Sequence, residues 1–222
     1  MKKQPWYIKN PVLFQQIKDD VTKNFPMIVT YIKESRVCIR GNLQLFDKQA
    51  KIIDQFTIEI ELPKTYPKGL PVIRELNGRI PRIADRHVNP NGDLCLFVPE
   101  EKWKYYPDNM PIVDFIKGPV SSYLLGQSYY EQIGKYPNGE RPHGAKGIIE
   151  VYSEILKTSD LEIIKTFIVY LSKEKAKGHW LCYCKSGKKL RNCHLNQLIE
   201  YRGKIEPPIA SNSLVNLALA GI

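Results

Sequence analysis

The sequence lacks any apolar run that approaches the roughly 20 consecutive apolar residues needed to cross a bilayer. Its first residues, MKKQPWYIKN, are basic but lack the apolar segment that a secretory signal requires. Neither a membrane-spanning helix nor a secretory leader is therefore expected. By default we expect a cytoplasmic protein with no membrane partner.

Cysteine is also scarce, with five in the chain, an odd number. Three of them crowd together near the end, as Cys182, Cys184 and Cys193. A small secreted scaffold usually has an even number of cysteines paired in disulfides, so a disulfide framework is not expected. The pattern favours a reducing compartment, in which thiols bind metal or act as catalysts.

The net charge of +10 is unevenly distributed, because nine Lys or Arg and only two Glu lie between Lys173 and Lys204. A basic segment of this kind can bind nucleic acid or an acidic protein surface. Charge asymmetry alone is weak evidence, however. We favour a simpler interpretation, in which part of the charge offsets metal-bound thiolates and the rest is solvated. Nucleic acid is therefore not expected to be the partner.

The spacing of apolar residues predicts an α+β fold. Asn10 and Pro11 are typical of a helix start, and that helix should end before Pro26. Residues 37–45 and 56–62 alternate between apolar and polar side chains, as antiparallel strands with one solvated face do. The fold should therefore contain an opening helix followed by an antiparallel meander.

The rest of the chain is expected to contain a long loop followed by helices. Residues 63–111 are rich in Pro, Gly and Asn but carry many large apolar groups, which favours a functional loop over a disordered one. Helices are expected at 112–125, with an interruption at Pro119, and at 148–156. A capping box of Ser159 and Glu162 predicts one more helix, through Leu171. Cys38 lies on the polar side of its predicted strand, and we interpret it as an incidental thiol.

Four candidate metal ligands lie close together in the sequence, as Cys182, Cys184, Cys193 and His194. Zinc prefers tetrahedral sulfur and nitrogen donors, and a site closed by four protein ligands is structural. So small a unit has almost no apolar core, so the metal should supply most of its folding energy. We therefore expect one structural Zn²⁺. This segment closely resembles the zinc-binding motif at the C-terminus of the SecA translocation ATPase, which implies a docking role.

The other candidate site lies in the segment HVNPNGDLCL, which runs from His87 to Leu96. Cys95 follows a Gly-Asp turn, and a partly exposed thiol can act as a nucleophile. The side-chain amide of Asn89 can donate a hydrogen bond to the oxyanion that forms during acyl transfer at a thioester. The alternative is a buried structural cysteine beside a turn, a common role of free cysteine.

These residues resemble the ubiquitin-conjugating enzyme family, in which a strand and a Tyr-Pro turn are followed by a nearby proline, His-Pro-Asn, Gly-x-Ile-Cys-Leu and a tryptophan. The matching residues are Tyr66, Pro67, Pro71, His87, Asn89, Gly92, Cys95, Leu96 and Trp103. Val88 stands where the family has proline, and the spacing from His87 to Cys95 is shorter than usual. Because of this shortening, Asn91 is an alternative to Asn89.

The resemblance implies a ubiquitin-conjugating-like fold in which Cys95 carries an acyl thioester and passes the acyl group to an amine. Asn89 would then stabilise the oxyanion, and His87 would hold the loop in shape. The expected partner is a protein donor with an activated C-terminus. Related bacterial proteins in antiviral operons suggest a cyclic-nucleotide synthase as this donor, with activation by a separate enzyme.

Besides nucleic-acid binding by the basic segment, two other functions stay open. One is a non-catalytic binding module of the same fold that docks partners through the zinc knuckle. The other is a cysteine protease that uses Cys95 with His87 or with His143. In domain terms, we expect a catalytic domain over residues 1–172, a basic linker and zinc knuckle over 173–205, and a C-terminal tail over 206–222.

Overall fold

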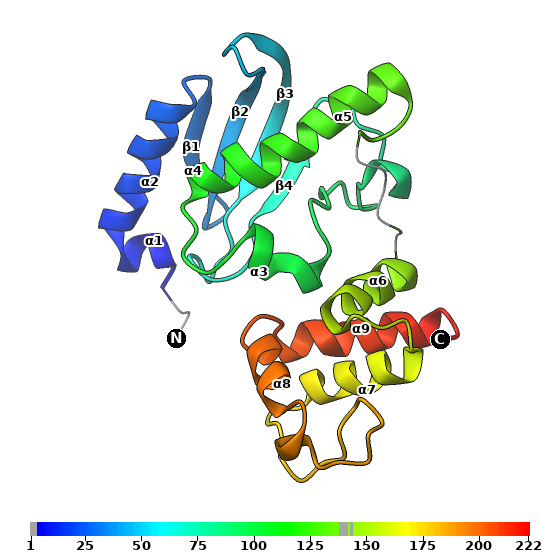
Figure 1. The fold of residues 1–222 in the computed structure, drawn as a ribbon. Coiled ribbons are helices and arrows are strands. Elements are labelled where there is room, and N and C mark those ends of the chain that lie inside the picture. The colour runs from blue at the N-terminus through cyan, green and yellow to red at the C-terminus, as the bar shows by residue number, and fades with distance from the viewer. Residues whose placement is uncertain (1–3, 138–141, 143) are drawn as a thin grey trace. The chain divides into compact units, whose positions relative to one another are not determined.

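The computed structural model describes residues 4–137, 142 and 144–222, and these divide into two compact units (Figure 1). Unit 1 comprises residues 1–96 and 106–139, and unit 2 comprises residues 97–105 and 140–222. The chain therefore leaves unit 1 shortly after Cys95, contributes a short segment to unit 2, and returns.

Unit 1 is built on a four-stranded antiparallel sheet, which includes the two strands that the alternating pattern predicted. Its strands lie in chain order: β1 (Ile28–Lys33), β2 (Arg36–Phe46), β3 (Ile52–Glu61) and β4 (Val72–Glu75). The predicted apolar positions are all buried, namely Val37, Ile39, Leu43, Leu45, Phe56, Ile58, Ile60 and Leu62. One face of the sheet therefore forms the core of unit 1.

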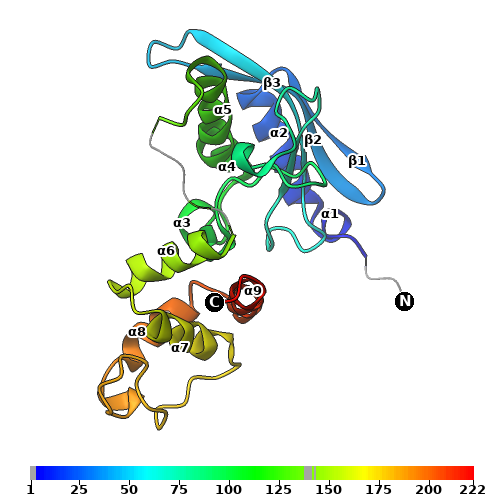
Figure 2. The ribbon, with the colours of Figure 1, turned by 90° about the vertical axis from the view of Figure 1, so that its right-hand side faces the viewer.

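Helices cover that core face. The opening helix α2 (Pro11–Asn24) begins where predicted, because the Asn10 side chain accepts a hydrogen bond from the backbone N–H of Leu13 at 3.1 Å. Helix α2, which follows the short α1 (Trp6–Lys9), contacts β1, and α5 (Ser121–Ile133) contacts β3. Figure 2 shows α2 and α5 on the same side of the sheet.

The α-helical pattern is interrupted around Pro119, as expected, although the chain stays helical there. A π-helical turn, Ile116–Val120, joins α4 (Ile112–Phe115) directly to α5. Proline lacks the N–H that an α-helix needs at this position. The wider turn accommodates it, and the Ser121 hydroxyl donates to the Ile116 carbonyl oxygen at 2.7 Å.

Cys38 is buried, although its strand pattern placed it on the polar side. It lies on the face of the sheet opposite the core, directly across from Tyr31 on β1 and Glu61 on β3. These longer neighbours flank the small thiol and leave it only 2% exposed. Burial, reinforced by Glu59 and Glu61, raises the pKa of this thiol.

Unit 2 is helical. Its elements are the 3-10 turn Pro99–Glu101, α3 (Lys102–Tyr105), α6 (Gly144–Leu156), α7 (Leu161–Ser172), the 3-10 turn Leu190–Asn192, α8 (Leu195–Arg202) and α9 (Pro207–Leu219). The predicted cap of α7 is one residue off: Asp160, not Ser159, accepts hydrogen bonds from the N–H groups of Glu162 and Ile163.

The compact units differ from the expected domain ranges of 1–172, 173–205 and 206–222. Helices α6 and α7 share one hydrophobic core with α8, α9 and the segment that carries the candidate metal ligands. Its fully buried members include Tyr152, Ile164, Phe167, Ile168, Leu171, Leu190, Leu198, Ile205 and Ala210. A boundary after residue 172 would divide this core.

Within the described part of the chain, no helix has the length and apolar character to cross a membrane.

Candidate functional site

The segment that carries Cys95 is a tight hairpin. The backbone N–H of Asn89 donates to the Asp93 carbonyl oxygen at 2.9 Å, and the N–H of Gly92 donates back to Asn89 at 2.8 Å. Gly92 has a φ of 87°, which favours glycine, and a Cβ there would lie 3.2 Å from Cζ of Arg82. The turn that precedes Cys95 therefore requires glycine.

The two arms of the hairpin meet at Val88 and Leu94, which pair directly and are both buried. One residue further along, the N–H of Cys95 donates to the carbonyl oxygen of His87 at 2.8 Å. Cys95 itself is only partly buried. The hairpin thus places a partly buried cysteine beside His87 and fixes its backbone by a direct hydrogen bond.

Strand β4 holds one side of the hairpin. The N–H of Leu94 donates to the Ile73 carbonyl oxygen at 2.8 Å, which extends the sheet by one further contact. The Asp93 carboxylate pairs with Nε of Arg74 at 2.8 Å. The hairpin is therefore attached to the sheet of unit 1.

Helix α5 holds the other side. Tyr123 donates its hydroxyl to the Arg86 carbonyl oxygen at 2.8 Å and lies 3.4 Å from the carbonyl oxygen of His87. Gln127 donates to the same Arg86 carbonyl at 3.0 Å and accepts from the Arg86 guanidinium at 2.6 Å. Burial raises the pKa of Tyr123 far above its ordinary value, so this hydroxyl remains a donor. These contacts fix the left-handed turn at His87, whose φ is 51°.

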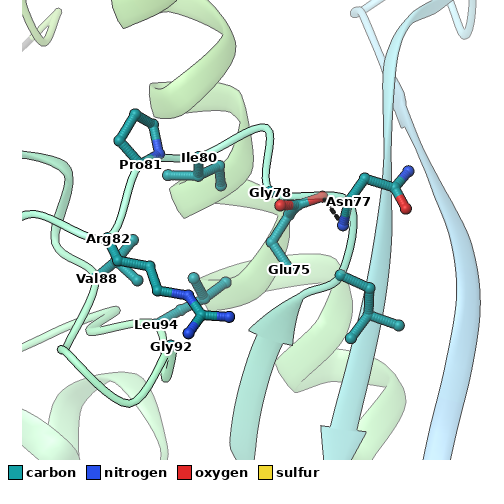
Figure 3. Close-up of a pocket in the computed structure, with 10 residues that line it drawn as sticks. Glu75, Asn77, Gly78, Ile80, Pro81, Arg82, Val88, Gly92 and Leu94 are labelled. Atoms are coloured by element: carbon teal, nitrogen blue, oxygen red, sulfur yellow. Dashed lines mark hydrogen bonds between the residues drawn. The ribbon is translucent and has the colours of Figure 1, made fainter.

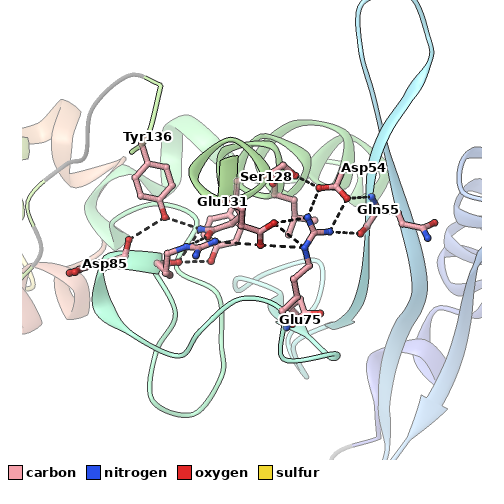
Figure 4. A network of polar contacts seen from close by, with 12 residues as sticks. Asp54, Gln55, Glu75, Asp85, Ser128, Glu131 and Tyr136 are labelled. Carbon is pink, nitrogen blue, oxygen red and sulfur yellow. Dashed lines mark hydrogen bonds and ion pairs between the residues drawn. The ribbon is translucent and has the colours of Figure 1, made fainter. Parts of the chain in front are cut away.

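A network of charged groups anchors the loop before the hairpin to the sheet and to α5 (Figure 4). Arg79 donates to both carboxylate oxygens of Asp54, at 2.8 and 2.7 Å, and to Glu131 on α5 at 2.6 Å. The Ser128 hydroxyl also donates to Asp54. Hydrogen bonds from Arg79 are the largest influence on Asp54 and, despite its partial burial, lower the pKa of its carboxyl to about 2.

This lowered pKa predicts a pH-dependent loss of stability. Because the folded state favours the ionised form, Asp54 stabilises the fold above the ordinary carboxyl pKa, and the contribution disappears as the pH falls towards 2. Asp54→Asn should cost about 1 kcal/mol at pH 7, discounted because the group is partly solvated. In urea unfolding, the difference from the parent protein should narrow between about pH 4 and 2. Asp20→Asn, at an exposed position, is the control. A difference in unfolding free energy between Asp54→Asn and the parent protein that does not change with pH would contradict the lowered pKa of Asp54.

A pocket of about 430 Å³ lies against the inner side of the hairpin (Figure 3). Its apolar lining includes Ile80 and the paired Val88 and Leu94. The Arg82 guanidinium points into it, and Glu75, also in the lining, accepts hydrogen bonds from the N–H groups that follow β4. A group bound in this pocket would contact the hairpin that carries Cys95.

The four candidate metal ligands converge, as predicted. One ligand atom from each of Cys182, Cys184, Cys193 and His194 lies within 4.8 Å of all the others. Cys182 Sγ and Cys193 Sγ lie 3.2 and 3.1 Å from His194 Nδ1, and Cys193 Sγ lies 3.6 Å from Cys184 Sγ. A tetrahedral metal bonded at about 2.3 Å to sulfur separates its ligand atoms by roughly 3.5–3.8 Å. The cluster is therefore suited to hold one metal ion.

The backbone of residues 180–194, here named the knuckle, is folded to present these ligands. The N–H of Cys182 donates to the Lys188 carbonyl oxygen at 2.8 Å, and Leu190 donates to Trp180 at 2.7 Å. Lys185 and Gly187 have positive φ angles of 62° and 71°, which reverse the chain between the ligand pairs. Two short arms thus bring the first and last ligands together.

The environments of two ligand thiols differ. Burial raises the pKa of the Cys182 thiol to about 11. Burial also opposes ionisation of Cys184, but hydrogen bonds with Ser186, Cys182 and Cys193 together outweigh it and lower the pKa of that thiol to about 6. Its Sγ lies 3.2 Å from the Ser186 hydroxyl oxygen. One ligand is therefore ready to bind as a thiolate at neutral pH.

The structure brings His87 and Cys95 together through their backbones and leaves Asn89 exposed on the turn. His143 lies outside the described residues. Sequence reasoning missed Tyr123 and Gln127, because they are far from the hairpin in sequence and look like ordinary helix residues. No family model, curated protein or solved structure gives a significant match to this chain.

Proposed function

We propose that this protein is an acyl carrier and transferase that forms a thioester at Cys95 in the manner of ubiquitin-conjugating enzymes. One observation carries the proposal: Cys95 is a partly accessible thiol whose backbone is bonded to His87 on a hairpin held by both β4 and α5. A structural cysteine does not need this accessibility. The antiparallel meander, with one helix before it and helices after it, is compatible with a ubiquitin-conjugating-like fold.

In the first step, the Cys95 thiolate attacks the carbonyl carbon of an activated C-terminus. A carbon–sulfur bond forms, and the bond to the activating group breaks and gives its electron pair to that leaving group. In the second step, an amine attacks the thioester carbonyl and loses a proton. The carbon–sulfur bond then breaks, an amide is formed and the Cys95 thiolate is regenerated.

The surroundings of Cys95 suggest different roles for three neighbouring residues. His87 acts through its backbone, since its carbonyl oxygen accepts the Cys95 N–H. Asn91 is engaged within the turn, where its side chain donates to Asp93 Oδ2 at 2.7 Å and accepts from the Asp93 N–H at 3.2 Å. The exposed Asn89 is therefore preferred over Asn91 as the donor to the oxyanion.

The proposal includes one Zn²⁺ per chain, bound by Cys182, Cys184, Cys193 and His194. Three sulfur donors and one imidazole are a typical structural zinc set, which closes the coordination sphere and stabilises the fold. As donor we propose a partner protein with an activated C-terminus, with the cyclic-nucleotide synthase of an antiviral operon as the first candidate. Activation is assigned to a separate enzyme.

The proposal is tested by co-expressing the chain with its genomic neighbours and separating the purified protein on non-reducing gels. We expect a covalent adduct that disappears on reduction and does not form with Cys95→Ala. The control is Cys38→Ala, which removes the other thiol of unit 1 and should leave the adduct intact. An adduct pattern that is the same for Cys95→Ala as for the parent protein would refute the thioester.

Alkylation provides a simpler test of the thiol itself. In the metal-loaded protein, iodoacetamide should modify Cys95 at least about tenfold faster than Cys38. The reason is that Cys38 is 2% exposed and that burial raises the pKa of its thiol. Mass spectrometry of the two peptides over time measures both rates. Equal rates would show that the Cys95 thiol is not the more accessible nucleophile.

The alternative function is a binding module that uses the knuckle for docking. Lys188, Lys189 and Arg191, which lie between the metal ligands in sequence, are exposed and favour an acidic partner surface. This alternative predicts that Cys95→Ala retains full cellular activity, whereas loss of the metal site abolishes it. The thioester proposal predicts that both variants are inactive.

A further inference from the structure

The segment that follows Cys95 belongs to the same compact unit as the metal ligands. Only Leu96 separates Cys95 from residues 97–105, which are part of unit 2 and are here named the clasp. The chain then returns to unit 1 at Tyr106. Any change in how firmly unit 2 holds the clasp therefore acts on the chain next to the candidate nucleophile.

Polar contacts hold the clasp to α9 and to the start of that helix. Glu100 is only 3% exposed and accepts a hydrogen bond from the hydroxyl of Ser213 at 2.6 Å. Lys102 pairs with Glu206 at 3.1 Å. A buried carboxylate bonded to a fully buried hydroxyl is costly to separate, so this end of the clasp is well defined in the folded unit.

Packing of Trp103 provides the second attachment. Its ring lies 6.3 Å from the ring of Tyr201 on α8, in an edge-on arrangement, and the Lys204 ammonium lies 4.5 Å from its ring centroid. The indole Nε1 of Trp103 has no hydrogen-bond partner among the described residues. Ring contacts thus hold this side chain against the core of unit 2.

The same ring contacts continue to the metal ligands. In order from the ligand to the clasp, the rings are those of His194, Tyr183, Phe167, Tyr201 and Trp103, with centroid separations of 5.4, 5.0, 6.2 and 6.3 Å. Tyr183 lies between two ligand cysteines in sequence, and Phe167 is fully buried. An unbroken series of packed aromatic rings therefore joins the metal cluster to the clasp.

We propose that metal binding at the knuckle fixes the clasp through this aromatic series and thereby restrains the chain that directly follows Cys95. Without the metal, the ligand thiols no longer hold Tyr183 and His194 in register, and Phe167 loses the ring that packs on its outer side. The clasp then opens more often because less of the core of unit 2 opposes its release. The metal site is thus an internal support of the reactive segment as well as a surface feature. Its consequence for thioester formation rests on the proposed function.

Hydrogen exchange tests the first step without any acyl donor. The full chain is compared in its zinc-loaded form and after removal of zinc by a chelator, with mass spectrometry of the peptides. We expect hydrogen exchange in residues 97–105 to be at least about tenfold faster without zinc, while exchange in β2 and β3 is unaffected. Unchanged exchange in the clasp would overturn the proposal.

A second variant separates the aromatic series from general unfolding of unit 2. Tyr201→Leu removes the ring that bridges Phe167 and Trp103 but leaves all four ligands in place. We expect this variant to retain one zinc per chain and the protection of α7, yet to show faster exchange in the clasp and faster alkylation of Cys95. Tyr170→Leu is the matched control, because Tyr170 packs on Trp180 and does not belong to the series. Exchange in the clasp should stay at the parent rate in this variant.

The outcomes for the two proposals are distinguishable. If the clasp responds to zinc and to Tyr201→Leu but no thioester forms, the structural coupling stands and the proposed function fails. If a thioester forms while Tyr201→Leu leaves the clasp and Cys95 alkylation unchanged, the coupling is wrong and the proposed function stands.

Discussion

Replacing Cys182 with serine is expected to abolish metal binding and to destabilise unit 2. Cys182 is only 5% exposed, and it is both a ligand and a member of the hydrophobic core. Structural zinc sites bind with apparent free energies of about 10–16 kcal/mol in isolated peptides. Part of unit 2 is held by its own core, so the loss in its free energy of unfolding should be smaller than this. It should still exceed about 3 kcal/mol. For a unit of this size that is a fall of roughly 15 °C in its unfolding temperature.

The measurement combines calorimetry with metal analysis of the purified variant. Cys38→Ser is the matched control, since it replaces a buried thiol of unit 1 by the same residue and should retain one metal per chain. Cys95→Ala should also retain it. If Cys182→Ser binds one zinc per chain and unfolds at the parent temperature, the knuckle does not hold a structural metal.

Gly41→Ala is expected to have the largest effect on unit 1. Gly41 lies inside β2, paired with Ile28 and Ile58, and its φ of 155° is one that other residues rarely adopt. A Cβ there would lie 2.0 Å from the backbone oxygen of Met27. Because the obstacle is the backbone of Met27 and Ile28 at the start of β1, the paired strands must shift to accept a methyl group. The expected cost is about 4 kcal/mol or more.

Urea unfolding followed by circular dichroism measures this cost. Gly118→Ala is the control, because a Cβ at Gly118 meets no atom within 4 Å and its φ is not positive. That variant should be neutral or slightly stabilising. A Gly41→Ala protein with the parent midpoint would show that β1 and β2 are not paired in this register.

Local patterns predicted much of this fold. Strict alternation along β3 identified the core face, because a strand with one buried side shows this period directly. The metal ligands were also predictable, since all four lie within one short segment whose spacing is set by a local turn. The start of α2 followed from the cap at Asn10, which acts on the next turn of the same helix.

The features that sequence reasoning missed depend on distant partners. Cys38 is buried by Tyr31 and Glu61 on neighbouring strands, which its own strand pattern does not reveal. Tyr123 supports the hairpin from α5 through a backbone carbonyl, and a contact of this kind leaves no local motif. The division into units was missed because the clasp joins α9 through Glu100, far along the chain.

The most direct test of the central claim is to map the acyl linkage on the chain purified with its genomic neighbours. Digestion of the adduct with trypsin under mildly acidic, non-reducing conditions should yield a modified peptide of residues 87–102, in which Cys95 is the single cysteine. The mass added to this peptide should equal that of the C-terminal fragment of the donor, and neutral hydroxylamine should release that fragment. A linkage at a lysine, or at Cys184 of the knuckle, would contradict it.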